Sequence, residues 1–192
     1  MISTERFEQV EVACLDALRA WLADNHQREE SVWLIRYKKS VPAKFIDRLN
    51  LLDELLCYGW IDGVARKLDD QRTMQLISPR KQQAWAQSYK DRVARLGSEG
   101  RMMAPGLAAI DRSKKHGLWD STAAVDALLV PDDLRSGMRA DGSAEAFFDA
   151  AAPSYRRNVL RWISQAKTSE TRARRIATTI DRSTKGEKIP QM

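Results

Sequence analysis

The sequence predicts an α+β fold, in which a small antiparallel sheet of three to four strands packs with helices and an all-helical C-terminal part follows. Three observations support this prediction. Runs rich in β-branched and aromatic residues occur within the first 80 residues. The polar residues Asp69-Asp70-Gln71 separate two of these runs, as in a β-hairpin. Beyond Trp119 the strand signals end and only helical periodicity remains.

The first part of the chain alternates between strand and helix patterns. Residues 6–12 partly alternate between polar and apolar side chains and predict a short strand, with a single helix over residues 4–25 as the alternative. Pro42, Gly59 and Pro79 end successive elements, because proline and glycine interrupt regular structure. The other expected elements are a helix from residue 14 to about 25, a strand at 31–39, a helix at 45–57, a hairpin of 60–68 and 73–78, and helices at 82–97 and 102–116.

The second part of the chain has the apolar spacing of amphipathic helices. Its polar tail, residues 183–192, is expected to fray. We therefore predict an α+β core domain at residues 1–119, which holds the LLCYGWIDG and SPRK motifs, and a helical extension at residues 120–192 packed on that core. The helices expected in the extension span residues 122–129, 131–140, 143–151, 153–166 and 169–183.

The net charge of +6 is unevenly distributed along the 192 residues. Residues 120–152 hold 2 basic and 7 acidic side chains, or −5, whereas residues 153–192 hold 10 and 3, or +7. The basic excess favours an anionic small molecule or an acidic partner surface, and intramolecular pairing between the two blocks is the alternative. Nucleic acid is a further partner class, although the sequence has no nucleic-acid-binding motif. The arginines expected on solvated helix faces are Arg156, Arg157, Arg161, Arg172, Arg174, Arg175 and Arg182.

The cysteines and histidines do not form a recognisable reactive set. Cys14 and Cys57 lie among apolar neighbours without a CxxC spacing, so we expect both to be buried and to hold no metal. His26 and His116 are far apart, each beside an expected helix end, which argues against a histidine catalytic pair. We expect no cofactor. Because the sequence has no long apolar run and no basic segment followed by an apolar one at its start, we expect a cytoplasmic protein that does not cross a membrane.

The expected hairpin holds one candidate site. Alternation along the strand places Trp60, Asp62, Val64 and Arg66 on one face of the sheet. Asp62 in a cleft would serve as an acid, a base or a ligand anchor, provided that burial or a charged neighbour adjusts its pKa. Alternatively, the tryptophan packs in the core and Asp62 caps a turn or pairs with an arginine. Gly63 marks a bulge or a close approach of the backbone.

A second candidate site lies where the hairpin leads into the next helix. Backbone N–H groups at a helix N-terminus attract anions, and Arg80 and Lys81 add positive charge there. Trp85 would stack on a ring, and the lysines that end a neighbouring strand would join the pocket. The alternative is a solvated loop with a core tryptophan. The complete ligand-binding set expected from both sites is Lys38, Lys39, Trp60, Asp62, Arg66, Ser78, Arg80, Lys81 and Trp85.

An ordered series of motifs resembles the YdeI/OmpD-associated family of bacterial proteins, which is also labelled a bacteriocin-protection family. The resemblance covers almost the whole chain and implies a non-enzymatic, cytosolic stress or bacteriocin-protection protein with a basic, tryptophan-lined surface for a ligand or partner. The motifs are LLCYGWIDG at residues 55–63, ISPRK at 77–81, Trp85, RVARL at 92–96 and GRMMAPGL at 100–107.

The chain also departs from the pattern of that family. Ala86 and Tyr89 replace a serine and an asparagine that family members often carry, and residues 47–50 replace their usual SYDE run. If those polar residues carry out chemistry in relatives, this chain lacks it. Two alternatives therefore remain beside the binding function: a small-molecule enzyme that uses a cleft between Asp62 and Arg80, and a nucleic-acid-associated accessory protein.

Overall fold

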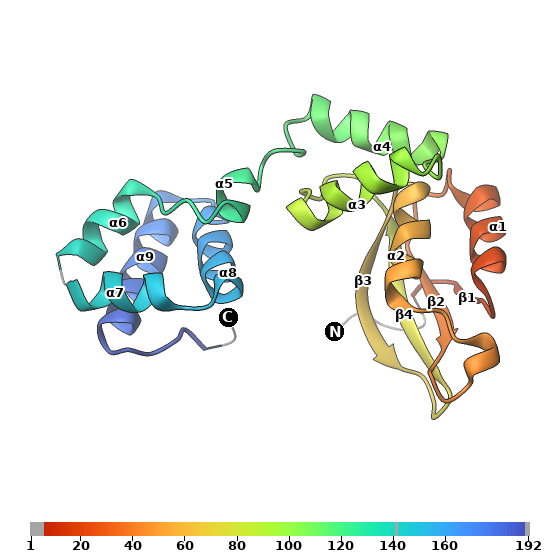
Figure 1. Ribbon diagram of the computed structural model, residues 1–192, viewed down its shortest axis with the longest axis horizontal. Helices are drawn as coiled ribbons and strands as arrows, with labels where there is room; N and C mark the ends of the chain where they lie inside the picture. The colour runs from red at the N-terminus through yellow and green to blue at the C-terminus, as the bar shows by residue number, and fades with distance from the viewer. Residues whose placement is uncertain (1–5, 141, 191–192) are drawn as a thin grey trace. The chain divides into compact units, whose positions relative to one another are not determined.

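The computed structural model describes residues 6–140 and 142–190, and the chain divides into two compact units, Met1–Asp120 and Ser121–Met192. The first unit contains a four-stranded sheet with helices, and the second is helical (Figure 1). The predicted α+β class is therefore confirmed. Among the described residues, no helix has both the length and the apolar character needed to cross a membrane.

The sheet of the first unit has the strand order β1-β2-β4-β3. Strands β2, β4 and β3 pair antiparallel as predicted, but β1 pairs parallel with β2. The reason is the helix α1, which returns the chain to the same end of the sheet before β2 begins. The elements of this unit are β1 (Gln9–Glu11), α1 (Leu15–Asn25), β2 (Val32–Tyr37), the short 3-10 helix η1 (Pro42–Lys44), α2 (Arg48–Cys57), β3 (Trp60–Lys67), β4 (Arg72–Pro79), α3 (Gln87–Ser98) and α4 (Ala104–Lys115).

Two local capping interactions explain where the first helices begin. The Cys14 Sγ accepts a hydrogen bond from the backbone N–H of Ala17 at 3.4 Å, so α1 starts after it and a single helix over residues 4–25 does not form. This thiol is exposed, contrary to the expectation that both cysteines are buried. The Asp47 carboxylate caps α2 by accepting from Leu49 N at 2.8 Å, which starts that helix after residue 47.

The sheet separates two clusters of apolar side chains. On one face, Val32, Leu34 and Ile77 belong to the main core, to which α1, α2, α3 and α4 all contribute buried residues. On the other face, Trp33 and the side chains beside it form a smaller cluster. Alternate residues of β2 therefore point to opposite faces, and both faces are covered.

A bulge in β3 reverses the expected orientation of its second half. The register shifts between Asp62 and Ala65, where β3 holds one residue more than β4. Asp62 pairs with Ile77 and so faces the helices, whereas Arg66 pairs with Met74 on the opposite face. The prediction that Asp62 and Arg66 share a face is therefore wrong, because simple alternation ignores the inserted residue.

The end of α2 packs tightly against the start of α4. The backbone N–H of Met103 donates to the carbonyl oxygen of Cys57 at 3.1 Å. Gly106 is buried there, and a Cβ atom at this position would lie 2.3 Å from that same carbonyl oxygen. Gly59, with φ +74°, lies so close to α4 that its own Cβ would be 2.9 Å from the Pro105 oxygen. Two glycine-containing motifs, distant in sequence, thus allow the two helices to meet.

Buried carboxylates on α2 join that helix to α3. Asp53 is 3% exposed and accepts hydrogen bonds from Arg92 at 2.5 Å and Arg95 at 2.6 Å. Its neighbour Glu54 is 4% exposed and accepts from Arg101 at 2.8 Å. Burial alone would raise the pKa of Asp53, but the hydrogen bonds from Arg92 and Arg95 outweigh it, and the pKa is lowered.

The second unit encloses a separate apolar core of residues from its own helices. The tail is part of it, since Ile189 is 7% exposed and its backbone N–H donates to the Tyr155 hydroxyl at 3.1 Å. The expectation that residues 183–192 fray is therefore wrong for the described part of the tail. The helices are α5 (Ala123–Asp126), α6 (Asp132–Arg139), α7 (Gly142–Ala150), α8 (Pro153–Ser164) and α9 (Ser169–Thr184).

Candidate anion-binding site

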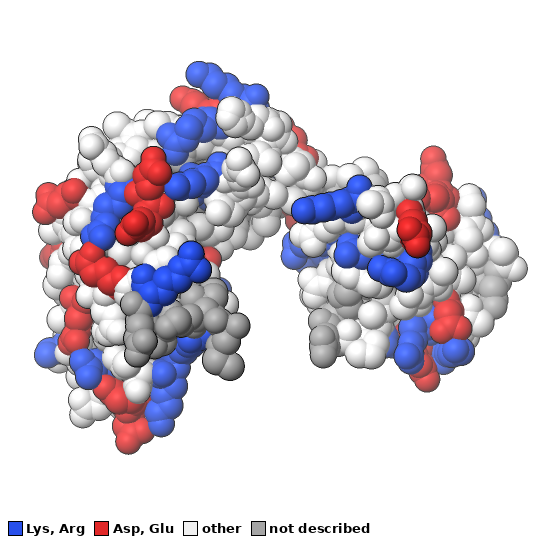
Figure 2. All heavy atoms as spheres, turned by 180° about the vertical axis from the view of Figure 1, so that it is seen from behind, with Lys and Arg blue, Asp and Glu red and all other residues white. Residues whose placement is uncertain are grey.

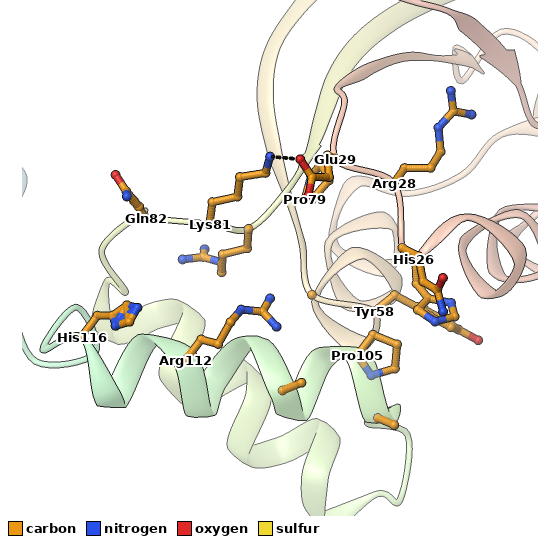
Figure 3. Close-up of a pocket in the computed structure, with 15 residues that line it drawn as sticks. His26, Arg28, Glu29, Tyr58, Pro79, Lys81, Gln82, Pro105, Arg112 and His116 are labelled. Atoms are coloured by element: carbon orange, nitrogen blue, oxygen red, sulfur yellow. Dashed lines mark ion pairs between the residues drawn. The ribbon is translucent and has the colours of Figure 1, made fainter.

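A cavity of about 830 Å³ opens in the first unit beside the close approach of α2 and α4 (Figure 3). Its walls come from the segment after α1, the end of α2, the segment after β4, and α4. The lining residues are His26, Gln27, Arg28, Glu29, Tyr58, Gly59, Pro79, Arg80, Lys81, Gln82, Ala104, Pro105, Ala108, Arg112 and His116.

Gly59 connects the walls of this cavity. Its left-handed φ of +74° turns the chain from α2 into β3, and its carbonyl oxygen accepts a hydrogen bond from the backbone N–H of Arg80 at 2.8 Å. On its other side it touches Pro105 at the start of α4. Gly59 therefore contacts both the end of β4 and the first turn of α4, although helix α3 lies between these two elements in the sequence.

Positive charge gathers on one side of the cavity. Figure 3 shows Arg112 reaching from α4 into the open space, with His116 one turn further along the helix. Arg112 is exposed, and among the described residues it has no ion-pair or hydrogen-bond partner for its guanidinium. Lys81 lies on the facing segment, where its Nζ is 3.6 Å from the carboxylate of Glu29 (Figure 3). These side chains form a cationic wall in which Arg112 is not neutralised.

On the opposite side of the cavity the polar side chains are already engaged in contacts within the protein. Arg28 forms an ion pair with Glu8 at 2.5 Å and points away from the other cations (Figure 3). His26 forms a hydrogen bond through Nδ1 with the carbonyl oxygen of Ala23 at 2.7 Å. Tyr58, which is 5% exposed, contributes ring surface rather than charge to this side.

Arg80 is an arginine buried in the wall of the cavity. It is 2% exposed, and its Cζ lies 3.9 Å from the centroid of the Trp85 ring. Nη1 donates to the carbonyl oxygens of Gln83 at 3.3 Å and Ala84 at 3.2 Å, whereas Nε and Nη2 are buried with no hydrogen-bond partner in the described structure. Burial lowers the pKa of Arg80 to about 10, so the side chain remains cationic at neutral pH.

The SPRK segment does not enter a helix as expected. Helix α3 begins at Gln87, and an irregular segment separates it from the end of β4. The helix N-terminus that lines the cavity belongs to α4 instead. Arg80 and Lys81 still line the cavity, so the sequence identified two of its residues by an argument that is wrong about the local structure.

The predicted tryptophans belong to the core. Trp60 is 1% exposed and packs edge-on against Trp21, with ring centroids 5.4 Å apart. Trp85 is also 1% exposed and lies 5.0 Å from the ring of Trp119. Neither Trp60 nor Trp85 is among the described residues that line the cavity. The wall is therefore cationic without being lined by tryptophan.

Asp62 lies in a polar cluster on the helix side of the sheet. Its carboxylate accepts hydrogen bonds from the Tyr89 hydroxyl at 2.8 Å and from Gln75 Nε2 at 3.2 Å, and it lies 3.7 Å from an Arg48 nitrogen. Burial, followed by the hydrogen bond to Asp62, raises the pKa of Tyr89 to about 12. Asp62 does not line the cavity, and Arg66 lies on the opposite face of the sheet.

The remaining predicted residues lie at two different ends of the sheet. Lys38 and Lys39 follow β2, and Lys38 Nζ donates to the carbonyl oxygen of Asp69 in the hairpin turn at 2.6 Å. Ser78 lies near the other end of β4, with its Oγ 2.7 Å from that of Ser31. Because β2 and β4 are antiparallel, the structure does not bring the two lysines to Arg80.

The sequence did not identify Arg112, Tyr58 or either histidine as site residues. Arg112 and His116 share one face of α4 with Ala104 and Ala108, because side chains four residues apart on a helix are neighbours. That spacing is visible in the sequence. What the sequence does not reveal is that this face of α4 meets the segments after α1 and β4.

The arginines of the second unit pair mainly within that unit. Arg172 binds Asp133 through two hydrogen bonds of 2.7 and 2.9 Å, and Arg156 lies 3.3 Å from Asp149. Arg182 pairs with Glu187. Figure 2 shows positive and negative side chains interspersed on the visible faces. Pairing between the acidic and basic blocks therefore uses part of the basic excess.

Two family models match separate parts of the chain. Residues 10–109 match a family described as a domain of unknown function, DUF8412, and residues 127–186 match the family described as Bacteriocin-protection, YdeI or OmpD-Associated. The chain belongs to the DUF8412 family, and the match to the YdeI/OmpD-associated family lies within its C-terminal unit. The predicted family is confirmed, but the LLCYGWIDG and SPRK motifs lie in the DUF8412 match. No curated protein and no solved structure matches the chain.

Proposed function

We propose that the DUF8412 unit of this protein binds a small anionic molecule in the cavity beside α4. The observation that carries the proposal is the Arg112 guanidinium, which reaches into a cavity of about 830 Å³ without an ion-pair partner among the described residues (Figure 3). Lys81 and His116 extend the same wall. Arginine is suited to this role because its planar donors match the oxygen pairs of carboxylates and phosphates.

A binding role agrees better with these side chains than an enzymatic one. Arginine keeps its proton at neutral pH and therefore holds anions rather than transferring protons. Burial raises the pKa of the Cys57 thiol to about 11, which leaves it protonated and poorly nucleophilic. Asp62, the residue on which the enzyme alternative depends, does not line the cavity. We accordingly propose a cytoplasmic, non-enzymatic binding protein, with a role in stress or bacteriocin protection suggested by the family of the second unit.

The variant Arg112→Ala tests this function against Lys115→Ala as a matched control. Both residues are exposed cations on α4, but Lys115 does not line the cavity. With inorganic phosphate, phenyl phosphate and benzoate as probes in calorimetry at low salt, we expect Arg112→Ala to weaken binding about 10-fold or more, because a charge-assisted hydrogen bond is lost. Lys115→Ala should bind within about twofold of the wild type.

Two results would contradict the proposal. In one, none of the three probes binds the wild-type protein. In the other, both variants weaken binding equally, which would indicate attraction to the overall positive charge rather than to the cavity.

A further inference from the structure

We infer that the ligand of this cavity is an organic anion with an apolar body, rather than a bare inorganic anion. The inference rests on the proposed function and specifies the chemical class that the site accepts. A cavity of about 830 Å³ is within the range of roughly 300–1,000 Å³ that holds drug-sized ligands, whereas an inorganic anion fills only a small part of it.

One face of helix α4 lines the cavity as a stripe of side chains whose chemical character changes along the helix. Ala104, Ala108, Arg112 and His116 line the cavity at successive intervals of four residues. Residues at this spacing lie one above another on the same helix face. The start of the stripe is therefore small and apolar, and its end carries the Arg112 cation and the His116 imidazole. A ligand lying along α4 meets apolar surface at one end and positive charge at the other.

Three residues beside the stripe, Tyr58, Pro105 and Lys81, follow the same division. Beside its apolar half lie Pro105 and the ring of Tyr58, which is 5% exposed and so already packed in place. Beside its cationic half lies Lys81. Figure 3 shows Tyr58 and Pro105 on one side of the open space and Lys81 and His116 on the other. The lining thus matches a molecule that is apolar at one end and anionic at the other.

Buried Arg80 strengthens the cationic half. Its guanidinium has no carboxylate within hydrogen-bond distance among the described residues, and its Nε and Nη2 donors have no partner. Because a buried charge acts strongly in a medium of low dielectric constant, Arg80 raises the positive potential of the adjacent wall, and the nearby Asp62 carboxylate offsets only part of it. The Arg80 charge favours the anionic head of the ligand at the same end as Arg112.

The variant Ala108→Phe fills the apolar half, and Leu107→Phe is its matched control. Ala108 lines the cavity, whereas Leu107 is 50% exposed on α4 and does not. In the wild type we expect phenyl phosphate to bind at least about 10-fold more tightly than inorganic phosphate, because the ring is removed from water. Ala108→Phe should abolish this preference, and Leu107→Phe should leave it unchanged. Circular dichroism checks that both variants are folded.

A ligand series in the wild-type protein tests the inference without any mutation. Affinity should rise from inorganic phosphate through methyl and butyl phosphate to phenyl phosphate, and the comparison of phenyl phosphate with benzoate identifies the preferred anionic head. If inorganic phosphate binds as tightly as phenyl phosphate and Arg112→Ala weakens both, the inference fails and the proposed function stands. If no probe binds, both fail.

Discussion

Replacing Gly106 with alanine is expected to destabilise the DUF8412 unit by about 3 kcal/mol. The added Cβ atom would lie 2.3 Å from the carbonyl oxygen of Cys57 and 2.8 Å from that of Leu56. Both are backbone atoms at the end of α2, so neither can move aside by changing a side-chain rotamer. The helices α2 and α4 must separate instead. Urea denaturation followed by circular dichroism measures the loss in free energy of unfolding.

The matched control for this variant is Gly97→Ala in α3. A Cβ atom at Gly97 meets nothing within 4 Å, and alanine is the better helix former by roughly 1 kcal/mol. The same substitution at two helical glycines of one unit should therefore have opposite signs. Equal effects would show that the contact between α2 and α4 is looser than the structure has it. Because α4 carries Arg112, Gly106→Ala should also weaken binding of phenyl phosphate.

Local sequence signals predicted the elements of the first unit well. The hairpin followed from its turn residues, and the helix expected at residues 102–116 is observed as α4, between Met103 and His116. The bulge was harder to use. Gly63 indicated an irregularity, but only the observed pairing shows that the inserted residue turns Arg66 to the other face. One inserted residue turns every later side chain of the strand to the opposite face of the sheet. Which face a residue occupies therefore depends on the pairing register and not on the amino-acid composition of the strand.

The candidate site was predicted only in part, for a different physical reason. Arg80 and Lys81 were found because they add positive charge at the point where the hairpin was expected to lead into a helix. Arg112 and His26 were missed because the cavity exists only where α4 meets segments far away in sequence. The close approach at Gly59 and Gly106 makes that meeting sterically possible. The approach of backbone segments that are distant in the chain cannot be read from local sequence patterns, so no local signal showed that these groups come together.

The second large effect is expected for Asp53→Asn, which should lower the free energy of unfolding by about 2–3 kcal/mol at neutral pH. The Asp53 carboxylate is 3% exposed and accepts hydrogen bonds from Arg92 at 2.5 Å and Arg95 at 2.6 Å. An amide keeps the size of the side chain but loses its charge, and it turns an N–H group toward the arginines. Thermal and urea denaturation measure the change.

Glu99→Gln is the matched control for Asp53→Asn. The Glu99 carboxylate also accepts from Arg95, at 2.7 Å, but it lies at the surface. Water replaces such an exposed ion pair readily, so its loss should change stability far less than the loss of the buried carboxylate. If the two substitutions lowered the free energy of unfolding equally, the burial of Asp53 would not be what makes its ion pairs with the arginines of α3 important.

The pH dependence of stability provides an independent test of the same carboxylate. The hydrogen bonds from Arg92 and Arg95 outweigh burial, so the folded-state pKa of Asp53 lies below its ordinary value. A carboxyl group with a lowered pKa stabilises the fold fully above its unfolded-state pKa of about 3.9, and this contribution is lost as the pH falls through the folded-state value. The wild type should therefore lose stability more steeply than Asp53→Asn below about pH 4, and the two curves should converge in acid. Parallel curves would mean that Asp53 has the same proton affinity in the folded and unfolded states. The contact between α2 and α3 would then owe its stability to packing rather than to the charge of Asp53.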